Sequence, residues 1–251
     1  MTLVDGHNDI VMAFFMLLAL YLLTTKHYTF SILTLSLSIA TKYITIIFLP
    51  LFLIYIYGSS ANTRSKVFFT LKTLVLNSLL FFFIFNLFDL DLLNLSSSIQ
   101  TLKLRLDTNS FPYITYTFLN TLSIPPKIPV FRMLSDYAFL LFCGGTYCYY
   151  FFKQKKSVIN IINISVLIYI AYFLIASFQF GSWYLVWILP LLLLSTFPKK
   201  NILFLLLSLA ALVSFWKRIS FLLIAISMVY AAYCFLSTKI ELPKLLRNAQ
   251  D

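Results

Sequence analysis

Apolar runs separated by short polar turns occupy most of the chain. These runs are Ile10–Leu23, Tyr28–Ala40, Ile44–Tyr57, Val67–Phe88, Tyr137–Phe152, Val158–Phe178, Tyr184–Phe197, Ile202–Trp216 and Phe221–Leu236. Several are shorter than the ~20 residues that a helix needs to cross a bilayer. The pattern predicts an all-α fold, a polytopic transmembrane helical bundle with about nine membrane segments. The second and third runs are either short helices that meet near Lys42 or a re-entrant pair.

The composition supports the membrane class. Hydrophobic residues make up 61% of the chain and charged residues 11%, whereas a soluble domain carries about 25% charged residues. The net charge of +11 does not indicate a nucleic-acid partner, because the basic residues sit in short turns, where membrane topology explains them. The cysteines lie in apolar runs, which argues against a disulfide framework or a thiolate metal site.

The charges also predict an orientation. Cytoplasmic turns of membrane proteins carry an excess of Lys and Arg. With the N-terminus external, most acidic residues fall outside and most basic residues fall inside, among them Lys26, Arg64, Lys66, Lys153 and Lys156. We therefore expect a multi-pass protein with an external N-terminus and a cytoplasmic C-terminus, surrounded by membrane lipids.

This topology divides the chain into three parts. Residues 1–88 form N-terminal membrane helices, 89–136 a long external loop, and 137–251 C-terminal membrane helices with a short cytoplasmic tail. The first part of the loop alternates leucine with polar residues and could lie amphipathically on the interface. The second part is rich in aromatic residues and proline and is expected to be irregular. Such a loop is either a roof over an external site or a plain connector.

The first candidate site is the cluster Asp5-Gly6-His7-Asn8-Asp9, directly before the first apolar run. It offers two carboxylates, an imidazole and an amide. Helix capping and a favourable helix dipole would explain one such residue. They explain a cluster of four polar side chains less well. Ionisable residues at a membrane segment mark a functional site by default.

Two further places carry polar chemistry among apolar residues. Lys42 lies between two apolar runs, where it either snorkels to headgroup phosphates or holds the phosphate of a substrate. The stretch from Gln179 to Pro190 combines Gln179 with Trp183 and Tyr184. Its aromatic residues are either an interfacial belt or part of a pocket.

Common soluble chemistries are missing from the sequence: it contains no P-loop, GxGxxG, HExxH or GxSxG motif. One succession of features resembles the integral-membrane glycosyltransferases of the GT-C class. It consists of GHND before an apolar run, a basic turn, a further apolar run and then ATKY. The likeness is greatest to polyprenyl-phosphate-sugar-dependent mannosyltransferase-like proteins. QFGSWYLVWILP, residues 179–190, resembles a later segment of that class.

The resemblance implies a hexosyltransferase, expected to act on mannose, with a polyprenyl-phosphate sugar donor and a glycan or lipid acceptor on the external face. It implies Asp5 or Asp9 as the catalytic base or as a ligand of a divalent metal, whose requirement stays open. It implies that His7, Asn8 and Lys42 hold the donor. Gln179, Trp183 and Tyr184 would line the pocket.

One feature departs from the class. Its members carry a first span and an outer acidic loop before the region that GHND matches, and both are missing here. We expect either a shortened enzyme or a split one that needs a partner chain for its N-terminal segment. The alternatives outside the class are a non-catalytic membrane fragment and a subunit of a lipid or solute transporter.

Overall fold

The structure is a computed structural model that describes residues 3–59, 63–87, 110–122, 127–152, 156–177 and 184–196, with the single positions Ile202, Ile226, Val229 and Tyr230. The described segments are helical and contain no strand. In chain order they are α1 (Leu3–Thr24), α2 (Tyr28–Thr41), the 3₁₀ helix η1 (Tyr43–Phe48), α3 (Leu49–Ser59), α4 (Thr63–Leu87), α6 (Phe111–Thr121), α7 (Ile128–Phe152), α8 (Val158–Ala171), the π-helical turn η2 (Tyr172–Ala176) and α9 (Leu185–Leu194).

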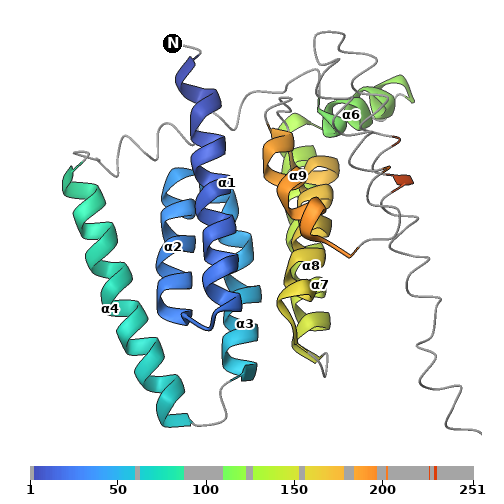
Figure 1. Cartoon of the computed structure of the whole chain (residues 1–251). Coiled ribbons are helices and arrows are strands. Elements are labelled where there is room, and N and C mark those ends of the chain that lie inside the picture. Colours follow the sequence, from blue (N-terminus) through green and yellow to red (C-terminus); the bar gives the residue numbers. More distant parts are fainter. Residues whose placement is uncertain are drawn as a thin grey trace, which may run out of the picture.

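The helices form two groups. Figure 1 shows α1, α2 and α3 side by side, and α7, α8 and α9 as a second group. α4 stands at the outer edge of the first group, and α6 lies across one end of the second. α1 joins the two groups, because it contacts α8 and α9 as well as α2.

The tightest pair is α1 with α2. The side-chain hydroxyl of Ser31 donates to the Ala19 carbonyl at 2.8 Å, and that of Ser38 donates to the Met12 carbonyl at 2.9 Å. Small side chains allow helix backbones to approach closely in an apolar environment, and a hydroxyl can then bond across the interface. These serines fix the register of the two helices over nearly their whole length.

Among the described residues, three helical segments are long and apolar enough to cross a membrane: Arg64–Ile84 of α4, Ile128–Phe152, which is α7, and Val158–Ala176, which joins α8 and η2. Most of the α4 surface is exposed, with Phe68 and Phe82 among its uncovered side chains, as expected of a helix that faces lipid. Within the described residues, each expected run from Ile10 to Phe197 is helical, although the third divides into η1 and α3. The last two runs fall almost wholly outside the described residues, so the count of nine segments stays a prediction.

The region between α4 and α7 corrects one expectation. The segment expected to be irregular contains α6, whose first turn is capped by the Ser110 side chain accepting from the Tyr113 N–H. Pro112 fits this first turn, because the nitrogen there has no helical acceptor to bond. A ring contact between Tyr116 and Phe131, with centroids 5.7 Å apart, ties α6 to α7.

Both α1 and α7 begin earlier than their apolar runs. α7 starts at Ile128, so Arg132 and Asp136 belong to its first turns and not to a loop ending at residue 136. α1 starts at Leu3, which places Asp9 inside the helix and away from its capping position. Hydropathy detects where a helix enters an apolar environment, whereas the helical backbone here begins at least about two turns before.

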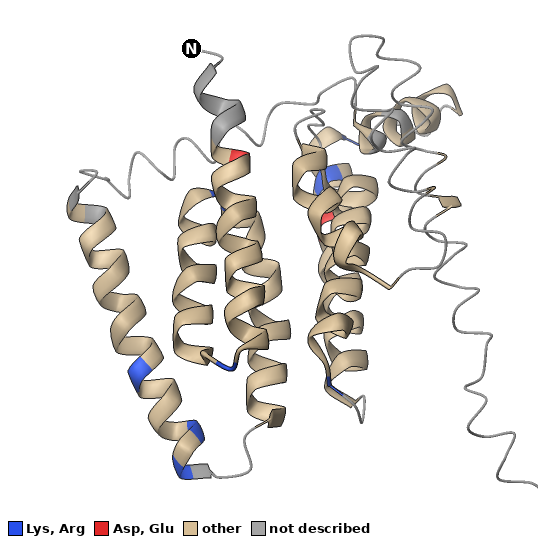
Figure 2. Ribbon diagram, viewed as in Figure 1, with Lys and Arg blue, Asp and Glu red and all other residues tan. Residues whose placement is uncertain are grey.

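Charges separate toward the two ends of the bundle (Figure 2). The α1–α2 turn, the start of α4 and the segment before α8 carry Lys26, Arg64, Lys66 and Lys156. At the opposite end, acidic residues appear together with basic ones, near the start of α1 and the start of α7. This end contains the candidate functional site.

Candidate functional site

Asp9 occupies a position that belongs to the core. The buried residues of α1 recur at helical spacing, and Asp9 lies on the same stripe as Met12, Met16 and Leu23, with 0% of its surface exposed. A buried carboxylate is costly unless its charge is compensated by a partner and by hydrogen bonds. Its partners therefore define the site.

Two donors reach the same carboxylate oxygen. The Lys42 ammonium lies 2.5 Å from Asp9 Oδ1, and the indole N–H of Trp187 donates to that oxygen, also at 2.5 Å. Asp9 Oδ2 is buried and has no hydrogen-bond partner among the described residues. The contacts bring together α1, the α2–η1 junction and α9, segments that lie far apart in the sequence.

The backbone at Lys42 explains how this side chain reaches α1. Lys42 is extended (φ −154°, ψ 113°) between α2 and η1, and its N–H still donates to the Ser38 carbonyl at 2.9 Å. α2 and η1 thus meet at Lys42, a junction that two short helices and a re-entrant pair would both have. The ammonium is directed inward, which disfavours simple snorkelling toward headgroups.

Aromatic rings surround the Lys42 ammonium. Its nitrogen lies 4.6 Å from the ring centroid of Trp187 and 4.8 Å from that of Tyr184, within the range of cation–π attraction. Trp187 in turn lies 5.9 Å from Tyr169 and 6.4 Å from Tyr172, measured between ring centroids. This packing holds the Asp9–Lys42 pair in a fixed orientation.

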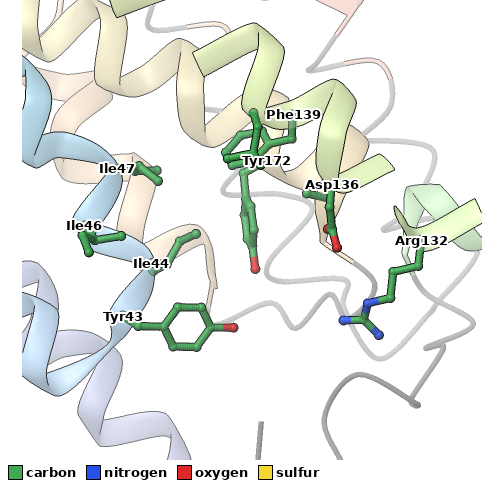
Figure 3. A pocket seen from close by; sticks show the side chains of 10 residues that line it. Tyr43, Ile44, Ile46, Ile47, Arg132, Asp136, Phe139 and Tyr172 are labelled. Carbon is green, nitrogen blue, oxygen red and sulfur yellow. The ribbon is translucent and has the colours of Figure 1, made fainter. Parts of the chain in front are cut away.

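A cavity of about 540 Å³ lies beside this cluster, between η1 and the helices α7 and η2. Its size is within the range of small-molecule sites. Figure 3 shows the hydroxyls of Tyr43 and Tyr172, the Asp136 carboxylate and the Arg132 guanidinium directed into the same space. The rest of the wall is apolar: Ile44, Ile46, Ile47, Phe139, Leu140 and Ala176.

One hydrogen bond fixes the spacing of the two walls. The Tyr147 hydroxyl of α7 donates to the Ile47 carbonyl of η1 at 2.5 Å. Tyr43 follows Lys42 directly in the sequence, and Tyr172 contacts both the cavity and the Trp187 ring. The buried ion pair and the cavity are therefore two parts of one end of the bundle.

The structure brings together only some of the residues that the sequence singled out. Asp9, Lys42 and Tyr184 meet in the cluster, while Asn8 lies on the exposed side of α1. The side chains of Asp5 and His7, and the residues Gln179 and Trp183, lie outside what the structure describes. Their predicted roles stay predictions.

Sequence reasoning missed Trp187, Arg132 and Asp136. Trp187 lies in the aromatic stretch that the sequence singles out, three residues after Tyr184. This spacing places the two rings on one helix face only if the stretch is helical, which α9 establishes. Arg132 and Asp136 were assigned to a loop. Their spacing of four residues places them on one helix face, a signal available once α7 is extended toward its N-terminus.

A divalent metal was left open by the sequence. Among the described residues, no three His, Cys, Asp or Glu side chains come close enough to hold a metal ion.

No protein-family model, no curated protein and no solved structure matches this chain.

Proposed function

We propose that this protein is a membrane glycosyltransferase that moves a hexose, expected to be mannose, from a polyprenyl-phosphate sugar to a glycan or lipid acceptor on the external face. The observation that carries the proposal is the buried Asp9–Lys42–Trp187 cluster beside a cavity that presents Arg132 and Asp136. Buried or intramembrane ionisable groups are expensive and mark functional sites. The sequence resemblance to GT-C enzymes supplies the reaction class.

The two described carboxylates suit different roles. Asp9 is fully buried and engaged by Lys42 and Trp187, so we assign it to positioning. Asp136 lies on the cavity wall and is exposed. A general base must come within hydrogen-bond reach of the proton that it removes, and of these two carboxylates Asp136 meets that need.

The reaction is a direct displacement. The acceptor hydroxyl oxygen attacks the anomeric carbon and forms the new glycosidic bond. The bond from that carbon to the phosphate oxygen breaks, and its electron pair leaves with the phosphate. The hydroxyl proton passes to the Asp136 carboxylate, and positive charge at this end of the bundle stabilises the departing phosphate.

The direct test is transfer of labelled mannose from a polyprenyl-phosphate mannose in proteoliposomes that contain the purified chain. Asp136→Asn is expected to lower kcat by about 10²–10⁴-fold, the usual contribution of a general base, with little change in the KM for the donor. Asp9→Asn is expected to change kcat and KM together, because it loosens the cluster. Asp251→Asn, which also removes one carboxylate, is the matched control.

Absence of transfer by the wild-type chain with each of several polyprenyl-phosphate hexoses would contradict the proposal and favour a non-catalytic fragment or a transporter subunit. If Asp136→Asn behaves like Asp251→Asn while Asp9→Asn abolishes transfer, the base assignment is wrong and returns to Asp9 or Asp5.

A further inference from the structure

The cavity between η1 and α7 is polar on one side and apolar on the other. Arg132, Asp136, Tyr43 and Tyr172 supply charged groups and hydroxyls, and the remaining lining residues are aliphatic or aromatic. A ligand that satisfies both sides has a charged or hydroxylated head and a hydrocarbon tail. A purely water-soluble substrate would leave the apolar wall without a partner.

The exposure of the lining residues gives the cavity a direction. Ile44 and Phe139 are almost fully buried, with 6% and 7% of their surface exposed, whereas Ile46 and Leu140 are 53% and 61% exposed. Among the described residues the cavity therefore runs from the lateral surface of the bundle inward. Exposed aliphatic side chains on a membrane-embedded surface face acyl chains, so the outer edge is suited to entry of a lipid from the side.

The charge of the site favours a phosphate head. Arg132 is partly buried in the first turns of α7, and its guanidinium is directed into the cavity (Figure 3). Guanidinium groups bind phosphate through two parallel hydrogen bonds and are less strongly hydrated than ammonium groups. The hydroxyls of Tyr43 and Tyr172 add donors beside it.

We propose that this cavity binds an isoprenoid phosphate, with Arg132 contacting the phosphate and the hydrocarbon chain leaving between Ile46 and Leu140. The inference rests on the proposed function in one respect: it states where the lipid donor of that reaction would bind. It assigns Arg132, Ile46 and Leu140 to substrate recognition, roles that the sequence did not indicate.

The test is a binding measurement without any sugar transfer. Purified protein in detergent is titrated with decaprenyl phosphate, and binding is followed by native mass spectrometry or tryptophan fluorescence. Arg132→Gln should weaken binding about tenfold or more, since a charged hydrogen-bonding partner is lost. Lys127→Gln, which removes an exposed cation one turn earlier that does not line the cavity, should change it less than about twofold.

The outer edge is tested by a second matched pair. Leu140→Trp fills the proposed exit and should weaken binding of decaprenyl phosphate. Leu141→Trp, at a neighbouring position that is 77% exposed and outside the cavity, should not. This pair also carries the test if Arg132→Gln fails to fold, which is judged by gel filtration and thermal unfolding.

Competitors identify the source of the phosphate. Decaprenol, inorganic phosphate and dioleoylphosphatidylglycerol should each compete poorly. If decaprenol competes equally, the phosphate has no role in binding. If inorganic phosphate competes equally, the lipid chain has no role. Equal competition by phosphatidylglycerol would reduce the site to a general contact for anionic lipid, and each of these results overturns the inference.

The outcome is separable from that of the transfer assay. Selective binding of decaprenyl phosphate that depends on Arg132, together with no sugar transfer, would keep the binding site and reject the enzyme. Sugar transfer that is unchanged by Arg132→Gln would keep the enzyme and reject the binding site.

Discussion

Asp9 and Lys42 form an ion pair whose two side chains differ in exposure. The Asp9 side chain has no exposed surface, whereas 25% of the Lys42 side chain is exposed. Without Lys42, the carboxylate stays buried with one donor, the Trp187 N–H. Without the charge of Asp9, the ammonium can still turn toward solvent or headgroups.

This asymmetry gives the first prediction. Removing one partner of a buried ion pair costs about 3–5 kcal/mol, so Lys42→Met should lower the free energy of unfolding by about that amount. Asp9→Asn should cost less, and the double variant should cost less than the sum of the two. Unfolding in detergent, followed by tryptophan fluorescence, measures the cycle, and Lys72→Met on the exposed face of α4 is the control.

Strictly additive losses would show that the two side chains do not interact in solution. A small effect of Lys42→Met would show that the buried carboxylate does not depend on the Lys42 ammonium.

The residue scale also shows where sequence reasoning reaches its limit. Asp9 and Lys42 were both identified because charged residues next to apolar runs are rare and costly. Their pairing was not, since it depends on the extended backbone at Lys42 and on the antiparallel packing of α1 and α2. Trp187 completes the pair from a helix more than a hundred residues away, and no local pattern encodes that contact.

At the scale of elements, the α1–α2 pair makes the second prediction. Ser38 lies between the two backbones and has no exposed surface, so a larger side chain must push the helices apart. Ser38→Leu should destabilise the protein by about 1–3 kcal/mol through overpacking. Ser38→Ala loses only one interhelical hydrogen bond and should cost about 0.6 kcal/mol.

The matched control for the added volume is Ala40→Leu, at an exposed position of the same helix. It should shift the free energy of unfolding by less than about 0.5 kcal/mol. Equal effects of Ser38→Leu and Ala40→Leu, measured by thermal unfolding in one detergent, would contradict close packing at Ser38.

The elements were easier to predict than their ends. Apolar runs located the described helices other than α6, because burial in lipid or core requires them. The starts of α6 and α7 were missed, since Pro112, Arg132 and Asp136 read as loop residues. A serine cap and a first-turn proline are helix-start signals in their own right, and applying them to Ser110 would have found α6.

For the whole molecule, the distribution of charge is the largest-scale regularity. The described end that holds Lys26, Arg64, Lys66 and Lys156 contains no acidic residue within the described segments, whereas Asp9 and Asp136 both lie toward the other end. An excess of basic residues marks the cytoplasmic side. The site is thus expected on the external side, where a lipid-linked donor would be used.

The orientation can be measured with single cysteines in a chain whose Cys143, Cys148 and Cys234 have been replaced. Thr25→Cys lies in the exposed turn after α1, and Lys127→Cys is exposed at the start of α7. In right-side-out vesicles, a membrane-impermeant maleimide should label Lys127→Cys and leave Thr25→Cys unlabelled. Permeabilised vesicles, in which both should react, are the control.

Each labelling pattern has a different consequence for the orientation of the bundle. α1 has 22 residues and is ~33 Å long at 1.5 Å per residue, but its apolar part, Asn8–Thr24, is shorter than the ~20 residues that a perpendicular span needs. Labelling of Thr25→Cys alone would mean that the bundle is inverted, which would move the Asp9 cluster and the cavity to the cytoplasmic side and exclude an externally used donor. Labelling of both positions from one side would mean that the helices between them do not carry the chain across the membrane. The separation of charge between the two ends of the bundle would then have a cause other than membrane topology.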